Sequence, residues 1–153
     1  MVTTAITRWR FIASGFGVGW TPKAPGTAGA LAGLAIGCIL LPAGNLALLT
    51  GIVAATALGI HAIRKLPEAG EDPGWIVIDE IAGQMIPLLA LRDLSLEGAL
   101  AAFALFRLFD ICKPPPVSWA DRRKDEIGIM GDDIIAGLLA LAVLLILRLV
   151  LPL

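Results

Sequence analysis

Acidic residues stand at the ends of long uncharged stretches of this chain: Asp79, Glu80, Asp110, Asp121, Asp132 and Asp133. A charged side chain at the centre of a membrane helix costs roughly 2.5 to 3.5 kcal/mol on insertion scales, so acids near such stretches mark a functional site by default. Carboxylate oxygens suit Mg²⁺, which proteins usually bind through one or two carboxylates together with substrate phosphate. The sequence therefore predicts a magnesium site beside a membrane.

The composition is that of an integral membrane protein. The chain has 153 residues, of which 58% are hydrophobic and only 16% charged, whereas soluble domains are about 25% charged. One domain, 1–153, is expected for this length. The net charge of −1 says little about partners, but the basic residues form short clusters at segment ends and no aromatic-laced basic stripe appears, so we expect no nucleic-acid partner. Glycines interrupt the segment after Arg8 and Arg10, which argues against a cleaved signal peptide.

Apolar runs and their breaks predict an all-α, polytopic membrane bundle of four to five helices. A helical hairpin is expected first, with arms at 27–41 and 46–63 around the turn signal at Pro42–Asn45. An N-terminal amphipathic or loop segment, 1–26, precedes the bundle at 27–153. Further helices are expected at 76–91, which either spans or re-enters because of Pro87, at 94–112 before three prolines, and at 134–151 with Asp132 and Asp133 at its start.

Basic residues predict the orientation of the bundle. If the segments alternate, one membrane face carries most of them, and Arg92 and Arg148 lie at the other. The positive-inside rule places the basic face in the cytoplasm. The same alternation brings to that face the acids named above together with Lys23 and Lys113.

Residues suited to phosphate binding lie near this layer. A glycine-rich stretch leads to Gly26 and Thr27, where a helix N-terminus could bind phosphate, although a flexible entry loop explains the glycines equally well. Arg107 could be a phosphate or carboxylate partner, or form a plain ion pair with Asp110 three residues later. Asp132 and Asp133 could merely cap a helix. The single histidine, His61, is interpreted as a packing residue.

Several phosphatase chemistries are excluded by what the sequence lacks. Cys112 is followed six positions later by Ser118 rather than arginine, no Asp-x-Asp pair occurs, and one histidine cannot support a histidine-nucleophile lipid phosphatase. Metal-assisted attack by water is the chemistry that remains.

Four motifs carry a family resemblance: Pro22–Gly29 (PKAPGTAG), Val77–Gly83 (VIDEIAG), Phe106–Pro114 (FRLFDICKP) and Gly128–Gly137 (GIMGDDIIAG). In this order they closely resemble the phosphatidylglycerophosphatase A family. The resemblance implies a bacterial inner-membrane, multi-pass, Mg²⁺-dependent enzyme that converts phosphatidylglycerophosphate to phosphatidylglycerol, with its site facing the cytoplasm. The chain departs from the family at Asp125 and Glu126, where a pair of glycines is typical.

From the residues and this resemblance we assign roles. The expected metal ligands are Asp79, Glu80, Asp110, Asp132 and Asp133. Lys113 and Asp121 complete the catalytic set, and the substrate phosphate is expected to contact Lys23, Gly26, Thr27 and Arg107. A homo-oligomer is compatible with the sequence. Two other functions stay open: a lipid phosphotransferase that uses a nucleotide-activated (CDP-) alcohol, and a small cation-binding transporter.

Overall fold

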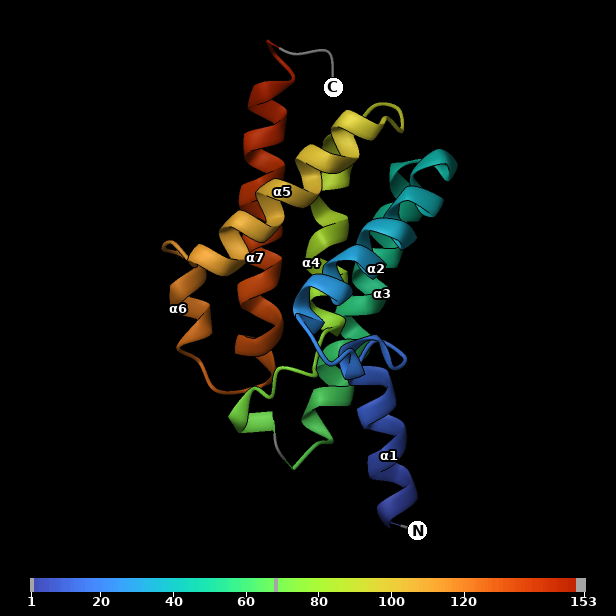
Figure 1. Cartoon of the computed structure of the whole chain (residues 1–153), viewed down its shortest axis with the longest axis vertical. Coiled ribbons are helices and arrows are strands. Elements are labelled where there is room, and N and C mark those ends of the chain that lie inside the picture. The colour runs from blue at the N-terminus through green and yellow to red at the C-terminus, as the bar shows by residue number, and fades with distance from the viewer. Residues whose placement is uncertain (1, 68, 151–153) are drawn as a thin grey trace.

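The computed structural model describes residues 2–67 and 69–150, and the regular secondary structure of this part of the chain is helical, without a strand. The all-α prediction is therefore confirmed. Figure 1 shows a bundle of upright helices crossed by one inclined helix, α5, with the two termini at opposite ends. The elements in chain order are α1 (Val2–Ala13), η1 (Val18–Trp20), α2 (Pro25–Leu40), η2 (Leu41–Ala43), α3 (Asn45–Arg64), η3 (Ala69–Glu71), α4 (Ile78–Met85), η4 (Ile86–Ala90), α5 (Leu96–Cys112), α6 (Val117–Asp121) and α7 (Glu126–Leu147).

Three segments of the described chain are long and apolar enough to cross a membrane. They are Pro25–Ala43, Asn45–Arg64 and Glu126–Leu147. The first two form the predicted hairpin, which turns at Gly44, where φ is +99°. Because glycine lacks a Cβ, it adopts this left-handed conformation at little cost.

The short helix α4 lies at the centre of the bundle, in contact with α2, α3 and α7. Nearly all of its residues are buried, and at Met85 it continues into the 3₁₀ segment η4, in which Pro87 cannot donate a backbone hydrogen bond. Together α4 and η4 rise by about 22 Å. The predicted helix at 76–91 is thus present, with the change of helix type at its proline.

Glycines allow α4 to approach its neighbours closely. A Cβ at Gly33 of α2 would lie 2.6 Å from the carbonyl oxygen of Ile81, and one at Gly83 would lie 2.6 Å from that of Asp133 on α7. Small residues permit such backbone contact between membrane helices. The two helices that contribute acids are therefore held together at the level of those acids.

Helix α7 begins eight residues earlier than predicted, so the prediction that Asp132 and Asp133 stand at a helix start was wrong. Asp125 caps the helix, because its carboxylate accepts a hydrogen bond from the Gly128 amide at 2.8 Å. Asp132 and Asp133 lie in the second turn and are buried, which removes the capping explanation for them.

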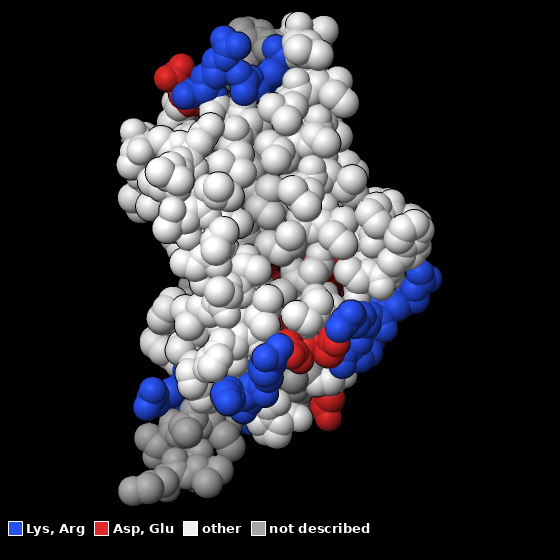
Figure 2. Space-filling view, turned by 180° about the vertical axis from the view of Figure 1, so that it is seen from behind, with Lys and Arg blue, Asp and Glu red and all other residues white. Residues whose placement is uncertain are grey.

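Charged residues gather at the two ends of the molecule, with a broad uncharged zone between them (Figure 2). At one end, the Arg148 side chain at the end of α7 donates to the carbonyl of Ala90, close to Arg92 in the chain. At the other end, Arg64 at the end of α3 pairs with Glu126 at the start of α7 at 2.7 Å. The uncharged zone has the location expected for the bilayer.

Candidate active site

Three carboxylates from two helices form a compact cluster. Asp79 and Glu80 lie in the first turn of α4, Asp133 lies in the second turn of α7, and one oxygen from each can be chosen so that all three lie within 4.8 Å of one another. Asp79 is 6% exposed and Asp133 4% exposed. Like charges this close in a buried site repel, so a cation is needed if they are ionised.

Two oxygens of the cluster lack any hydrogen-bond partner in the described chain: Glu80 Oε2 and Asp133 Oδ1. A buried polar atom without a partner is costly unless a ligand or water satisfies it. The fully buried amide of Gln84, one turn along α4 from Glu80, is also unpartnered at both of its polar atoms. The donor set, made of hard oxygens with free lone pairs, fits Mg²⁺.

Arg107 links Asp110 to the start of α2. Its guanidinium pairs with Asp110 one turn away on α5, and a second nitrogen donates to the Thr27 hydroxyl at 3.4 Å. A Cβ at Gly26 would lie 2.5 Å from Glu80 Oε1 and 3.5 Å from an Arg107 nitrogen. The N-terminus of α2 therefore lies against Glu80 and Arg107.

This helix N-terminus can bind an anion. No side chain caps it, and Ala24 precedes it in a left-handed conformation with φ of +49°. Pro25 then occupies the first turn, where its missing N–H costs nothing. The first amides of a helix and its dipole favour phosphate, so the predicted role of Gly26 and Thr27 has the required local geometry.

Lys113 lies beside the cluster and forms hydrogen bonds with two further carboxylates. Its ammonium donates to Asp132 at 2.7 Å and also to Asp121. Partial burial alone would lower the pKa of Lys113, but the hydrogen bonds to both carboxylates outweigh it and raise the pKa above its ordinary value. The hydrogen bond from Lys113 lowers the pKa of Asp121, so this carboxylate stays ionised and is a weak base.

The structure thus brings together nearly all the predicted site residues. Asp133 interacts electrostatically with Asp79, Asp110 and Asp132, which places the latter two at the border of the cluster. Lys23 differs, because it is exposed in the loop before α2 and makes no ion pair within the described part of the chain. His61 lies outside the cluster, with its ring 5.0 Å from that of Trp9, as expected for a packing residue.

Two local features were not predicted. The first is Gln84, whose position four residues after Glu80 is the sequence signal that places it on the same helix face. The acids that replace the family's glycines also have partners, since Asp125 pairs with Arg123 at 2.7 Å and Glu126 with Arg64. Their charge is therefore balanced locally.

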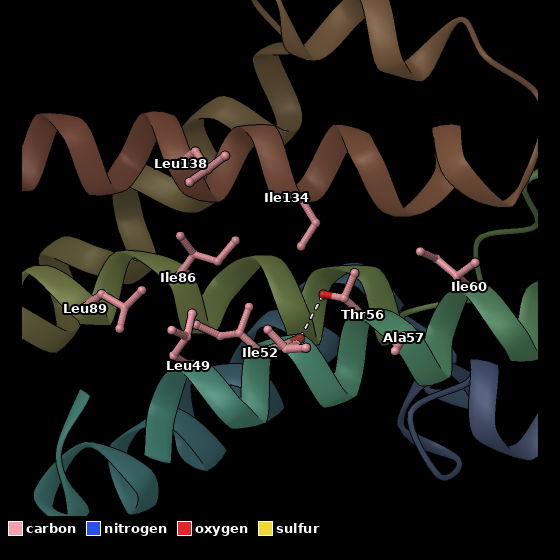
Figure 3. Close-up of a pocket in the computed structure, with 10 residues that line it drawn as sticks. Leu49, Ile52, Thr56, Ala57, Ile60, Ile86, Leu89, Ile134 and Leu138 are labelled. Atoms are coloured by element: carbon pink, nitrogen blue, oxygen red, sulfur yellow. Dashed lines mark hydrogen bonds between the residues drawn. The ribbon is translucent and has the colours of Figure 1, made fainter. Parts of the chain in front are cut away.

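A separate groove between α3, η4 and α7 has a volume of about 400 Å³ and is apolar (Figure 3). Its one polar side chain, Thr56, donates to the carbonyl of Ile52 at 2.8 Å. The lining of this groove holds no charged side chain, unlike the carboxylate cluster.

Comparisons with known proteins show the family to which the chain belongs. The family model described as phosphatidylglycerophosphatase A matches residues 11–148. A Haemophilus influenzae phosphatidylglycerophosphatase A is 43% identical over 136 residues, covering 86% of this chain and 83% of the relative. The Escherichia coli phosphatidylglycerophosphatase A is 35% identical over 143 residues, covering 89% and 81%.

A Bacteroides thetaiotaomicron protein with the provisional name phosphatidylinositol-3-phosphatase is 43% identical over 145 residues, covering 90% of this chain and 91% of the relative. No solved structure matches the chain. Since the family model spans all four motifs and the relatives align over most of their length, the chain belongs to the phosphatidylglycerophosphatase A family.

Proposed function

We propose that this protein hydrolyses the terminal phosphomonoester of phosphatidylglycerophosphate to phosphatidylglycerol and phosphate, in bacterial phospholipid synthesis. Family membership supports this function. The observation that carries it is the buried cluster of Asp79, Glu80 and Asp133 beside the uncapped N-terminus of α2. This arrangement pairs a cation-binding set with a phosphate-binding helix end at one end of an apolar bundle.

Mg²⁺ is the proposed cofactor. Asp79, Glu80 and Asp133 would hold it, because two of their buried oxygens have no protein partner, and Asp110 and Asp132 border the set. When bound, Mg²⁺ would neutralise negative charge on the phosphoryl oxygens and lower the pKa of a water molecule.

The protein's own groups bind and orient the phosphate. The amides of Gly26 and Thr27 face the anion at the start of α2, and the Arg107 guanidinium lies beside them. Lys23, which is exposed in the loop just before α2, is close enough in sequence to approach the same group. These donors stabilise the charge that develops as the phosphoryl group is transferred.

The reaction is hydrolysis with a balanced set of bonds. Water oxygen forms a bond to phosphorus while the bond from phosphorus to the glycerol oxygen breaks, and that oxygen takes up a proton. A carboxylate of the cluster accepts the proton that water loses. Asp121 is poorly suited to this step, since its hydrogen bond with Lys113 lowers its pKa.

The location of the site suits a lipid substrate. We propose an inner-membrane, multi-pass arrangement in which α4–η4 and α5 cross beside the three apolar helices and the site faces the cytoplasm. The uncharged zone of Figure 2 and the basic residues around the end that holds Arg64 support this orientation. The acyl chains can stay in the bilayer while the headgroup reaches the cluster.

The test is phosphate release from defined lipids by the purified protein in detergent. We expect release from phosphatidylglycerophosphate that stops with EDTA and returns with Mg²⁺. Asp79→Asn should abolish it, and the matched control His61→Ala, outside the site, should retain it. Faster release from phosphatidylinositol 3-phosphate would favour the substrate named for the Bacteroides relative.

Two outcomes would overturn the hydrolase proposal. Formation of a new phosphodiester from a CDP-alcohol, without phosphate release, would indicate the phosphotransferase. Ion flux into liposomes in the absence of hydrolysis would indicate the transporter. Chemical cross-linking in nanodiscs tests separately whether the protein forms a homo-oligomer.

A further inference from the structure

The carboxylates around the active site fall into two sets according to what neutralises them. Asp110 pairs with Arg107, and both Asp121 and Asp132 pair with Lys113. Asp79, Glu80 and Asp133 have no Lys or Arg partner in the described structure. The protein thus supplies cations to one set and leaves the other for an external ion.

Lys113 bridges its two acids from a fixed position. It ends α5 in a left-handed conformation with φ of +44°, and three prolines follow it. Asp132 is 6% exposed and the Lys113 side chain 32% exposed, so this contact is shielded from water on the side of Asp132. The ammonium therefore lies between a carboxylate of α7 and one of α6, where a bridging metal ion would otherwise be suited.

Asp132 and Asp133 are neighbours on α7 but belong to different sets. Successive helical residues point about 100° apart, so one carboxylate can face α4 while the other faces Lys113. Asp133 lies with Asp79 and Glu80, and Asp132 lies with Lys113. Asp133 therefore faces the position of the external ion, and Asp132 faces the Lys113 ammonium.

We propose that the Lys113 ammonium takes the place of a second divalent cation between Asp121 and Asp132, so that each chain binds one ion, through Asp79, Glu80 and Asp133. This inference rests on the proposed function, because it concerns the ion that the hydrolase would use. It gives Lys113 a role in fixing the number of ions rather than a direct contact with the phosphate. A positive charge remains at the second position whether or not metal is available.

The test counts bound Mn²⁺, used as a paramagnetic probe, on the whole protein in nanodiscs by electron paramagnetic resonance. We expect one ion per chain in the unaltered protein and no spin coupling between ions. Lys113→Met should bind two ions, with coupling between them, because Asp121 and Asp132 lose their cation. Lys113→Arg keeps the charge and should bind one, as should the matched control Lys65→Met, which changes an exposed lysine outside the site.

Two bound ions in the unaltered protein would overturn the inference without needing any variant. One ion in folded Lys113→Met, as judged by an unchanged thermal transition, would overturn it as well. If Lys113→Met does not fold, the count in the unaltered protein and in Lys113→Arg decides. Two ions with normal phosphate release refute only the one-ion inference, whereas absence of Mn²⁺ binding with absence of release refutes the proposed function too.

Discussion

Gly26→Ala tests whether the contact between α2 and the cluster sets the position of a catalytic carboxylate. The added Cβ would lie 2.5 Å from Glu80 Oε1, and ordinary contacts of this kind begin at 3.4 Å. The carboxylate must therefore move by about 0.9 Å. Because the obstructing atom is the end of a flexible side chain rather than backbone, the helix packing should survive while Glu80 is displaced.

The expected loss follows from that displacement. A misplacement of about 1 Å in a catalytic arrangement can cost roughly 100-fold in rate, equivalent to about 2.7 kcal/mol of transition-state stabilisation. We therefore expect kcat for phosphate release to fall on the order of 100-fold, with weaker Mn²⁺ binding. The assays are steady-state phosphate release at saturating lipid and Mn²⁺ titration of the same sample.

Gly131→Ala on α7 is the matched control. Its Cβ would meet nothing closer than the Ala120 Cβ at 3.7 Å, so the substitution introduces no overlap in a helix. It should keep kcat and raise helix stability slightly, since glycine is less favourable than alanine by roughly 0.5 to 1 kcal/mol. Unchanged kcat and Mn²⁺ affinity in Gly26→Ala would refute the claim that Glu80 acts from its position beside α2.

Three further outcomes follow from the structure. Gln84→Met should raise the temperature of the thermal transition, since it replaces an unpartnered buried amide with an apolar side chain of similar size. Burial of such an amide costs about 1 to 3 kcal/mol. A lower transition temperature would show that the amide has a bound partner. The difference in thermal transition between the unaltered protein and Asp121→Asn should be constant above about pH 5 and shrink below about pH 4. The reason is that the Lys113 hydrogen bond lowers the pKa of Asp121, so the stabilisation from this hydrogen bond is lost as the pH falls through the lowered pKa. A difference independent of pH from 3 to 7 would contradict this. Arg64→Gln should cost less than about 1 kcal/mol in unfolding free energy, because its pair with Glu126 is exposed; a larger loss in denaturant titration would show a further role.

Much of the site could be predicted because membrane burial makes acidic residues conspicuous. Asp79, Glu80 and Asp133 stand out in sequence precisely where hydrocarbon should exclude charge, and alternation of the helices is enough to bring them to one face. The hairpin could be predicted equally well, since two uncharged runs on either side of a turn at Pro42–Gly44 define it. The apolar composition of the segments and the turn residues between them therefore indicate which helices pack together.

The division of the acids could not be predicted, because it depends on side-chain direction. Asp132 and Asp133 are equivalent in an alternation argument, yet only one shares the cluster with Glu80. The start of α7 was also missed, since the charged residues at 121–126 favour a loop or a surface helix ahead of the apolar run, and the cap at Asp125 is seen only in the structure. Tertiary contacts decide both features.

The close approach of α4 to α7 at Gly83 has a consequence for how such a protein can change over evolution. Gly83 is three residues from Glu80, and the backbone it touches is that of Asp133. An insertion or deletion of one residue in α4 would rotate the following turn by about 100°, moving the contact surface and the acids relative to each other. The contact between α4 and α7 and the positions of the acids therefore cannot change independently. Sequence changes among descendants are expected in loops and lipid-facing positions rather than in the length of α4.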